Sequence, residues 1–187
     1  MAPTIGGTRI VHDGWSRFLV ADITLADGSR IKREIEDHGR AVAVLPYDPD
    51  RKVALLVEQF RPPAFLASGI TSLIEVPAGL LDENDPEEGA KREASEEVGV
   101  TLGALEHVGT VWSMPGISTE QMDLYLGPYR AKDRHGSGGG LAEEQENIIV
   151  REIELATLAA MSDAGELTDM KTLTLLLALR LRHPELF

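Results

Sequence analysis

The chain has 187 residues and no cysteine, and its 18 Lys and Arg against 31 Asp and Glu give a formal net charge of −13. The lack of cysteine excludes disulfides, thiolate catalysis and cysteine-ligated metal sites, and the negative charge makes nucleic acid an unfavourable partner. The length suits one compact domain with a small appendage. No stretch approaches 18 consecutive apolar residues, so we expect neither a membrane span nor a signal peptide, and a cytoplasmic location is compatible with the composition.

The first half of the chain is predicted to be mainly β structure. Residues 17–25 and 31–35 are rich in β-branched and apolar residues and flank Asp27 and Gly28, a pair typical of a hairpin turn. Two further apolar runs, residues 41–47 and 52–60, predict antiparallel buried strands. A loop is expected over residues 61–71, followed by a short strand over 72–76.

The pattern becomes helical at Asp85, which can cap a helix over residues 86–98 that begins with Pro86 and ends at Gly99. Strands are predicted over 106–112, 121–126 and 148–153, and a mobile glycine-rich loop over 131–146. Helices are expected over 156–164 and 169–182. These elements together predict an α+β protein with a mixed sheet flanked by helices.

The predicted helix 86–98 concentrates Arg92, Glu93, Glu96 and Glu97 within two turns. Three carboxylates then share one face, where they repel each other unless a cation lies among them. Oxygen ligands are those that Mg²⁺ and Mn²⁺ prefer, and Arg92 is placed to pair with Glu96. The alternative is an ordinary solvated acidic face.

The segment from residue 79 to residue 100 resembles the Nudix box, G-x5-E-x7-R-E-U-x-E-E-x-G-U, in which U is an aliphatic residue. The spacing before Arg92 is one residue shorter than in this pattern, and Asp85 lies near the slot of the first glutamate, where it can also serve as the helix cap. Shortened boxes of this kind are typical of the GDP-mannose hydrolase branch. The matching residues are Gly79, Arg92, Glu93, Glu96, Glu97, Gly99 and Val100.

The resemblance extends over most of the chain through IEVPAGLLD, WSMPGISTE and GGGLAEEQENI, which are similar to segments of the nucleoside-diphosphate-sugar pyrophosphatases. It implies a Nudix fold, an α/β/α sandwich with a mixed sheet, preceded by an N-terminal β-hairpin subdomain. The implied domains are residues 1–40, which serve dimerisation by strand exchange, and residues 41–187, which form the hydrolase. A homodimer with no nucleic-acid or membrane partner is therefore expected.

The resemblance also implies site residues. The metals, Mg²⁺ or as a substitute Mn²⁺, are assigned to the carbonyl of Ala78 and to Glu93 and Glu97, with Glu96 assisting. The base that activates water is assigned to Glu146, with Glu144 as second candidate and Glu143 nearby; an ordinary acidic loop is the alternative. The catalytic set is thus Glu146, Glu144, Glu96 and Arg92.

Residues assigned to substrate binding are Arg61, Glu120, Gly116 and Gly79. Arg61 is equally well explained by a surface salt bridge, and Glu120 by a plain loop carboxylate. Glu75 either faces the site or pairs with a basic neighbour.

The implied activity is metal-dependent hydrolysis of the diphosphate of a nucleoside diphosphate sugar. GDP-mannose, giving GMP and mannose 1-phosphate, is favoured by the short box and by the similarity of the tail GELTDMKTLTLLL. ADP-ribose, giving AMP and ribose 5-phosphate, is the second substrate. The alternatives of other classes are a non-catalytic Nudix-like binding module and an isopentenyl diphosphate isomerase, whose usual catalytic cysteine is missing from this chain.

Overall fold

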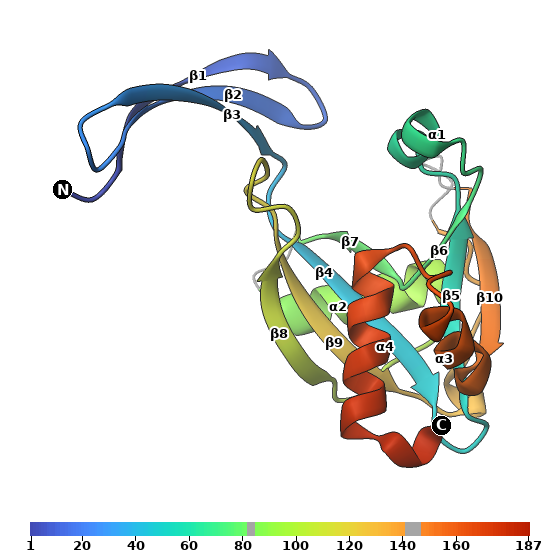
Figure 1. Ribbon diagram of the computed structural model, residues 1–187. Coiled ribbons are helices and arrows are strands. Elements are labelled where there is room, and N and C mark those ends of the chain that lie inside the picture. Colours follow the sequence, from blue (N-terminus) through green and yellow to red (C-terminus); the bar gives the residue numbers. More distant parts are fainter. Residues whose placement is uncertain (82–84, 141–146) are drawn as a thin grey trace. The chain divides into compact units, whose positions relative to one another are not determined.

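The computed structural model describes residues 1–81, 85–140 and 147–187 (Figure 1). The chain divides into two compact units. Residues 1–41 and 111–122 form the N-terminal unit, and residues 42–110 and 123–187 form the main unit. The first unit thus includes a segment that lies about 70 residues beyond its own strands in the sequence.

The N-terminal unit is a three-stranded antiparallel sheet of β1 (Thr4–Asp13), β2 (Arg17–Thr24) and β3 (Arg30–Asp37). The predicted hairpin is confirmed, since β2 pairs with β3 around a turn in which Gly28 has a φ of +85°. The sequence analysis missed β1, whose two adjacent glycines weaken the β-strand pattern.

Residues of the segment 111–122 bind along the end of β3. The Glu36 N–H donates to the Ile117 carbonyl at 2.8 Å, and the Thr119 N–H donates to the Glu36 carbonyl at 2.9 Å. Ser118 forms a parallel bridge with Glu36. The loop is therefore held by the N-terminal sheet.

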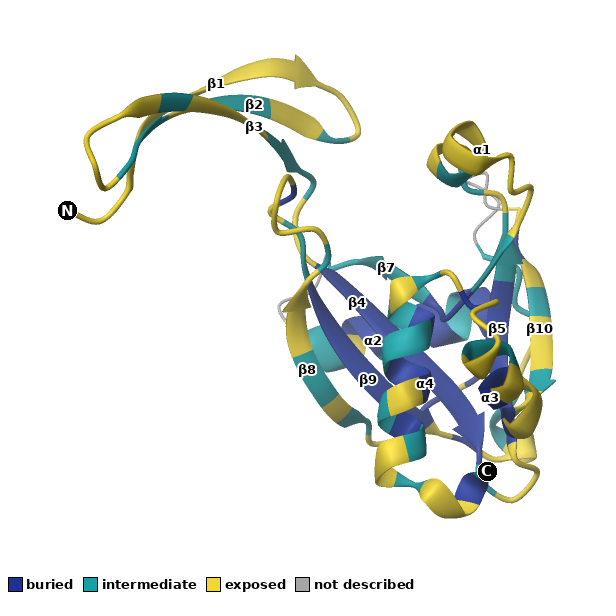
Figure 2. Ribbon diagram, viewed as in Figure 1, coloured by how far each residue is buried: buried dark blue, intermediate teal, exposed yellow. Residues whose placement is uncertain are grey.

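The main unit is built on a seven-stranded mixed sheet with the order β10-β5-β4-β9-β8, to which β6 adds beside β5 and β7 beside β4. The strands are β4 (Ala41–Asp48), β5 (Val53–Gln59), β6 (Leu73–Glu75), β7 (Ala78–Leu80), β8 (Glu106–Trp112), β9 (Gln121–Pro128) and β10 (Ile149–Glu154). Strand β5 pairs antiparallel with β4, β6 and β10. Figure 2 shows that the central strands β4, β5 and β9 are the buried ones.

Helices cover both faces of this sheet. Val42 and Val44 of β4 belong to one core cluster with Ala90 and Ala94 of α2 (Pro86–Val98). Successive strand residues point to opposite faces, so Ala43 and Leu45, both fully buried, point to the face that carries α4 (Met170–Arg182; Figure 1). The α+β sandwich with a mixed sheet expected from the sequence is confirmed.

Helix α3 (Leu155–Asp163) and α4 agree with the prediction, whereas α1 (Pro62–Ser68) lies within the segment predicted as a loop. None of the residues of α1 is buried, so the helix has no apolar periodicity to reveal it. The short strand β7 and the 3₁₀ turns Ala131–Asp133 and Pro184–Leu186 were also missed. In the described part of the chain, no helix combines the length and the apolar composition needed to cross a bilayer.

Candidate functional site

Helix α2 carries the acidic motif and has well-defined ends. The Asp85 carboxylate accepts a hydrogen bond from the Glu87 N–H at 3.0 Å, and Pro86 occupies the first turn. Gly99 ends the helix in the left-handed conformation with a φ of +66°. Asp85 is therefore the N-cap of α2. This agrees with its interpretation from the sequence as a helix cap.

Glu93 and Glu97 lie on the buried side of α2, with exposed fractions of only 8% and 2%. The Glu97 Oε2 accepts a hydrogen bond from the Ala78 N–H at 3.1 Å, which brings the start of β7 against the helix. A buried carboxylate is costly unless it is paired or bound. The fold thus buries two carboxylates, Glu93 and Glu97, at the positions that the sequence predicted as metal ligands.

Arg92 connects the helix to β7 and to its neighbouring carboxylates. Its Nη1 lies 2.9 Å from Glu93 Oε1 and 2.9 Å from Glu96 Oε2, and its Nη2 donates to the Leu80 carbonyl at 3.3 Å. The predicted pairing with Glu96 is present. Among the residues that the structure describes, no three His, Asp or Glu side chains are grouped as a metal site, and the Arg92 guanidinium lies between Glu93 and Glu96 instead.

Gly79 lies directly against one of these carboxylates. A β-carbon at this position would come within 2.2 Å of Glu93 Oε1, which is closer than non-bonded atoms approach. The sequence assigned Gly79 to substrate binding, whereas its contact here is with Glu93. Only glycine leaves room for the Glu93 side chain in this position.

A network of charges around the buried carboxylate of Glu75 joins β6, α1 and α4. Arg61 binds Glu75 through two hydrogen bonds, from Nε at 2.7 Å and from Nη2 at 3.0 Å, and Lys171 Nζ donates to the same carboxylate at 2.9 Å. Lys171 also donates to Asp169 at 2.7 Å. Glu75 is 2% exposed, so it is a buried carboxylate shared by two cations.

The charges of this network shift the pKa values of its two cations, Lys171 and Arg61. Burial lowers the pKa of Lys171, but the charges of Glu75 and Asp169 outweigh burial and leave the pKa raised. Burial likewise lowers the pKa of Arg61, and Glu75, followed by Glu97 and Asp169, raises it above its ordinary value. The influence of Glu97 on Arg61 links the network electrostatically to the acidic helix.

The network answers two questions that the sequence left open. Glu75 pairs with basic neighbours, and Arg61 is one of them. The sequence analysis missed Lys171 and Asp169. The available signal was Glu75 itself, because a carboxylate in a short apolar strand requires a partner.

Glu120 and Gly116 belong to the N-terminal unit. His38 bridges two carboxylates there: its Nδ1 contacts Glu36, and its Nε2 lies 3.0 Å from Glu120 Oε1. Trp15 stacks on the His38 ring, with centroids 5.1 Å apart. Gly116 lies in the loop that binds β3, and a β-carbon added there would have no atom of the described residues within 4 Å. The roles assigned to Glu120 and Gly116 in substrate binding stay predictions.

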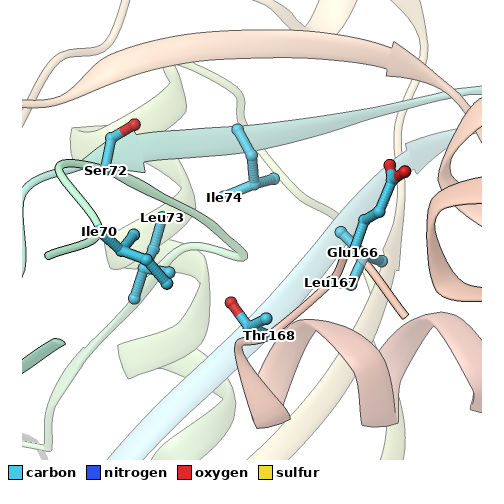
Figure 3. A pocket seen from close by; sticks show the side chains of 7 residues that line it. All are labelled: Ile70, Ser72, Leu73, Ile74, Glu166, Leu167 and Thr168. Carbon is cyan, nitrogen blue, oxygen red and sulfur yellow. The ribbon is translucent and has the colours of Figure 1, made fainter. Parts of the chain in front are cut away.

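The two candidates for the base, Glu144 and Glu146, lie outside the described residues, as does Glu143. Figure 3 shows a separate pocket of the main unit. Its volume of about 180 Å³ is smaller than the roughly 300–1,000 Å³ of typical ligand pockets. Its lining residues are Ile70, Ser72, Leu73, Ile74, Glu166, Leu167 and Thr168.

Comparison with known proteins identifies relatives along most of the chain. The NUDIX domain matches residues 37–166. The GDP-mannose pyrophosphatase of Salmonella arizonae is 35% identical over 180 residues, which cover 94% of this chain and 93% of the relative. The GDP-mannose pyrophosphatase of Cronobacter sakazakii is 37% identical over 169 residues, which cover 89% and 87%.

The fold has a solved counterpart. The crystal structure of an ADP compounds hydrolase superimposes with a TM-score of 0.79 and covers 99% of this chain and 96% of its own, at 17% identity. This similarity supports the fold, and the sequence relatives support the family. The domain match, the identity to curated relatives and the acidic helix together show that the chain belongs to the Nudix hydrolase family.

Proposed function

We propose that this protein is a metal-dependent hydrolase that cleaves the diphosphate of a nucleoside diphosphate sugar, with GDP-mannose as its first substrate. The observation that carries the proposal is the pair of buried carboxylates, Glu93 and Glu97, on α2, where Glu97 accepts a hydrogen bond from Ala78 at the start of β7. The relatives named GDP-mannose pyrophosphatase support the substrate.

Nudix hydrolases generally need divalent metal ions. Here the proposed ligands are the Ala78 carbonyl, Glu93 and Glu97, assisted by Glu96, and this set of oxygen donors suits Mg²⁺, with Mn²⁺ as a substitute. When bound, the metal supplies charge neutralisation for the diphosphate and lowers the pKa of the attacking water. In this structure Arg92 holds the Glu93 carboxylate and the Ala78 N–H holds that of Glu97.

The proposed reaction adds water across the diphosphate. The water oxygen bonds to one phosphorus as the bridging P–O bond breaks, giving GMP and mannose 1-phosphate from GDP-mannose. Glu146 takes the proton of the attacking water, with Glu144 as the second candidate for this role. Arg92 keeps Glu93 and Glu96 oriented through its two ion pairs.

Arg61 is the proposed contact for the diphosphate. Its side chain is 42% exposed although Glu75 holds it by two hydrogen bonds, so the cation is fixed in place while part of it meets solvent. A guanidinium oriented in this way is suited to a phosphate oxygen. Gly79, Gly116 and Glu120 complete the proposed substrate-binding set.

The N-terminal unit supports a further part of the proposal, a homodimer that exchanges N-terminal strands. A small sheet needs an apolar face packed on another surface, but Ile10 and Val11 are 49% exposed and Phe18 is 37% exposed. We assign residues 1–40 to dimerisation and residues 41–187 to hydrolysis. Light scattering tests the proposed homodimer, because a monomer at micromolar concentration contradicts it.

The proposed location is the cytoplasm.

The decisive experiment is a phosphatase-coupled phosphate-release assay with GDP-mannose, ADP-ribose, ADP-glucose and NADH. Each substrate is tested with Mg²⁺, Mn²⁺ or EDTA. We expect metal-dependent release from GDP-mannose. A stronger signal from ADP-ribose reassigns the substrate, and no release from any of the four by the folded protein favours a binding module.

Two variants locate the base. If Glu146 takes the proton, Glu146→Gln lowers kcat by roughly 100-fold or more with little change in KM, because proton transfer contributes about 10²–10⁴-fold. Glu144→Gln is the matched control. If kcat falls further in Glu144→Gln than in Glu146→Gln, the base is Glu144.

A further inference from the structure

The start of α4 binds the chain at the point where β6 ends. Val76 follows the last residue of β6, and its N–H donates to the Oγ1 of Thr172 at 2.8 Å. Just before it in the chain, the Glu75 carboxylate accepts a hydrogen bond from Lys171 at 2.9 Å. Two successive residues of α4 thus bind two successive residues that lead from β6 towards β7.

The hydroxyl of Thr172 has a second partner, which fixes its direction. Thr172 is only 1% exposed, and its Oγ1 donates to Asp169 Oδ2 at 2.7 Å. Burial raises the pKa of Asp169, but the charge of Lys171 and the hydrogen bonds from Lys171 and Thr172 lower it overall, so this carboxylate is ionised and only accepts. The single hydroxyl proton therefore goes to Asp169, and an oxygen lone pair is left for the Val76 N–H.

The helix does not need this hydroxyl for its own N-terminus. Asp169 is the N-cap of α4, and its carboxylate accepts a hydrogen bond from the Thr172 N–H at 2.9 Å. That bond comes from the backbone, so any residue at position 172 other than proline supplies it. The hydroxyl adds a contact outside the helix, and this contact is with Val76.

The next two residues along the chain are also held by hydrogen bonds. The Pro77 carbonyl accepts from the Val44 N–H of β4 at 3.0 Å. The Ala78 N–H donates to the Glu97 Oε2 of α2 at 3.1 Å. The chain between β6 and β7 is therefore bound by α4, by β4 and by α2 at three successive residues.

This short connection is stiff. Proline locks φ at about −65°, so rotation at Pro77 is restricted. The residue before a proline is restricted to extended conformations, and here it is Val76, whose branched side chain limits it further. A displacement of the Val76 N–H is therefore passed on to Ala78 and is not absorbed by rotations between the two residues.

We infer that Thr172 is a positioning residue for the metal site: its hydroxyl holds Val76 and thereby fixes the location of Ala78. This inference rests on the proposed function, in which the Ala78 carbonyl and the Glu97 carboxylate are metal ligands. It differs from a purely structural role, in which the hydroxyl stabilises the fold and metal affinity does not depend on it.

The test compares Thr172→Val with Thr172→Ser in the full-length protein. Valine has the shape of threonine without the hydroxyl, and serine keeps the hydroxyl without the methyl group. Isothermal titration of the metal-free protein with Mn²⁺ measures the affinity. We expect Thr172→Val to bind Mn²⁺ about 10-fold more weakly than the wild type, the scale for losing a group that orients a metal ligand, and Thr172→Ser to bind it normally. The Mn²⁺ concentration that gives half-maximal turnover rises by the same factor.

A control variant separates positioning from stability. Leu179 is fully buried on α4, about two turns beyond Thr172. Leu179→Ala destabilises the fold by leaving a cavity and does not change the hydroxyl, and chemical denaturation measures its loss of stability beside that of Thr172→Val. We expect the folded control to bind Mn²⁺ normally. An equal loss of affinity in the two variants overturns the inference, as does normal affinity in Thr172→Val or weakened affinity in Thr172→Ser.

A second variant decides the question if Thr172→Val does not fold. Pro77→Ala keeps the Thr172 hydroxyl in place but frees the rotation that connects Val76 to Ala78. We expect a similar loss of Mn²⁺ affinity, and normal affinity overturns the inference. A wild-type protein that neither binds Mn²⁺ nor hydrolyses any substrate of the panel contradicts the proposed function itself, which distinguishes the two failures.

Discussion

The Cα of Gly79 lies against the carboxylate of Glu93, so close that a β-carbon on residue 79 would meet Glu93 Oε1 at 2.2 Å. Glycine at this position is thus a condition for the location of a buried carboxylate. The substitution Gly79→Ala leaves the strand intact but requires the Glu93 side chain to move.

We expect Gly79→Ala to lower both turnover and Mn²⁺ affinity by about 10- to 100-fold, the effect of disturbing a group that orients a metal ligand. Steady-state kinetics and isothermal titration with Mn²⁺ measure the two quantities. Gly103→Ala is the control, because a β-carbon there would meet none of the described residues within 4 Å. Equal activity of the two variants contradicts the role given to Gly79.

Glu97→Gln tests the buried carboxylate directly. The amide oxygen still accepts the hydrogen bond of the Ala78 N–H, so the fold is retained, but the negative charge that binds a cation is removed. Turnover is expected to fall roughly 100-fold or more, as electrostatic groups in active sites contribute on this scale.

The matched control for this variant is Glu87→Gln, in the first turn of the same helix, where Glu87 pairs with Lys91 at 2.9 Å. Circular dichroism shows whether both proteins fold. A folded Glu97→Gln protein with near-normal turnover removes Glu97 from the metal site.

The sequence predicted α2 to the residue because its signals are local. Asp85, Pro86 and Gly99 mark its ends within the segment itself, and the acidic motif lies entirely between them. Strand β1 and helix α1 carry no buried residues, so their apolar pattern is weak. Local signals thus predicted α2, which carries the acidic motif, better than these elements at the surface.

Contacts between distant segments were beyond the sequence. Glu75 and Lys171 are 96 residues apart, and only the packing of α4 beside β6 brings them together. The hydrogen bond from the Val76 N–H to the Thr172 hydroxyl is equally hidden, because it leaves no periodic signal. The motif therefore identified the candidate ligands, whereas the fold was needed to find what holds them.

Lys171→Met tests the energetic role of this network. The variant removes one of the two cations of Glu75, which is 2% exposed. Because Arg61 still pairs with Glu75, the expected loss is smaller than that of a buried charge left without a partner, about 3–5 kcal/mol, but larger than that of an exposed pair. Chemical denaturation measures the free energy of unfolding. Lys32→Met is the control, because its pair with Asp22 is largely exposed and such pairs contribute under about 1 kcal/mol. Equal stability of the two variants rules out a structural role for the network.

The bridge of His38 between Glu36 and Glu120 predicts a dependence on pH. Burial lowers the pKa of His38, but its hydrogen bonds to Glu36 and Glu120 outweigh burial, so the pKa is raised above its ordinary value of about 6.5. Burial raises the pKa of Glu36, while hydrogen bonds from Ser118, Ser16 and His38 lower it overall.

The raised pKa of His38 and the lowered pKa of Glu36 determine how the stability of the bridge depends on pH. The bridge contributes its full stability below the pKa of His38 in the unfolded chain, and the contribution is lost as the pH rises through the higher folded-state pKa. The contribution of Glu36 is lost at the acid end, as the pH falls through its lowered pKa. The loop that carries Glu120 is therefore held most firmly in mildly acidic solution.

Proton NMR titration of the His38 ring measures this, with Glu120→Gln expected to bring its pKa down. Glu34→Gln, at an exposed position two residues before Glu36, is the control and leaves the titration unchanged. Hydrogen exchange of the Thr119 amide, which donates to the Glu36 carbonyl, is expected to accelerate above the folded-state pKa of His38. If the His38 pKa is the same in wild type and Glu120→Gln, the bridge does not hold the loop in solution, because a charge partner at 3.0 Å cannot be removed without changing the proton affinity of the ring.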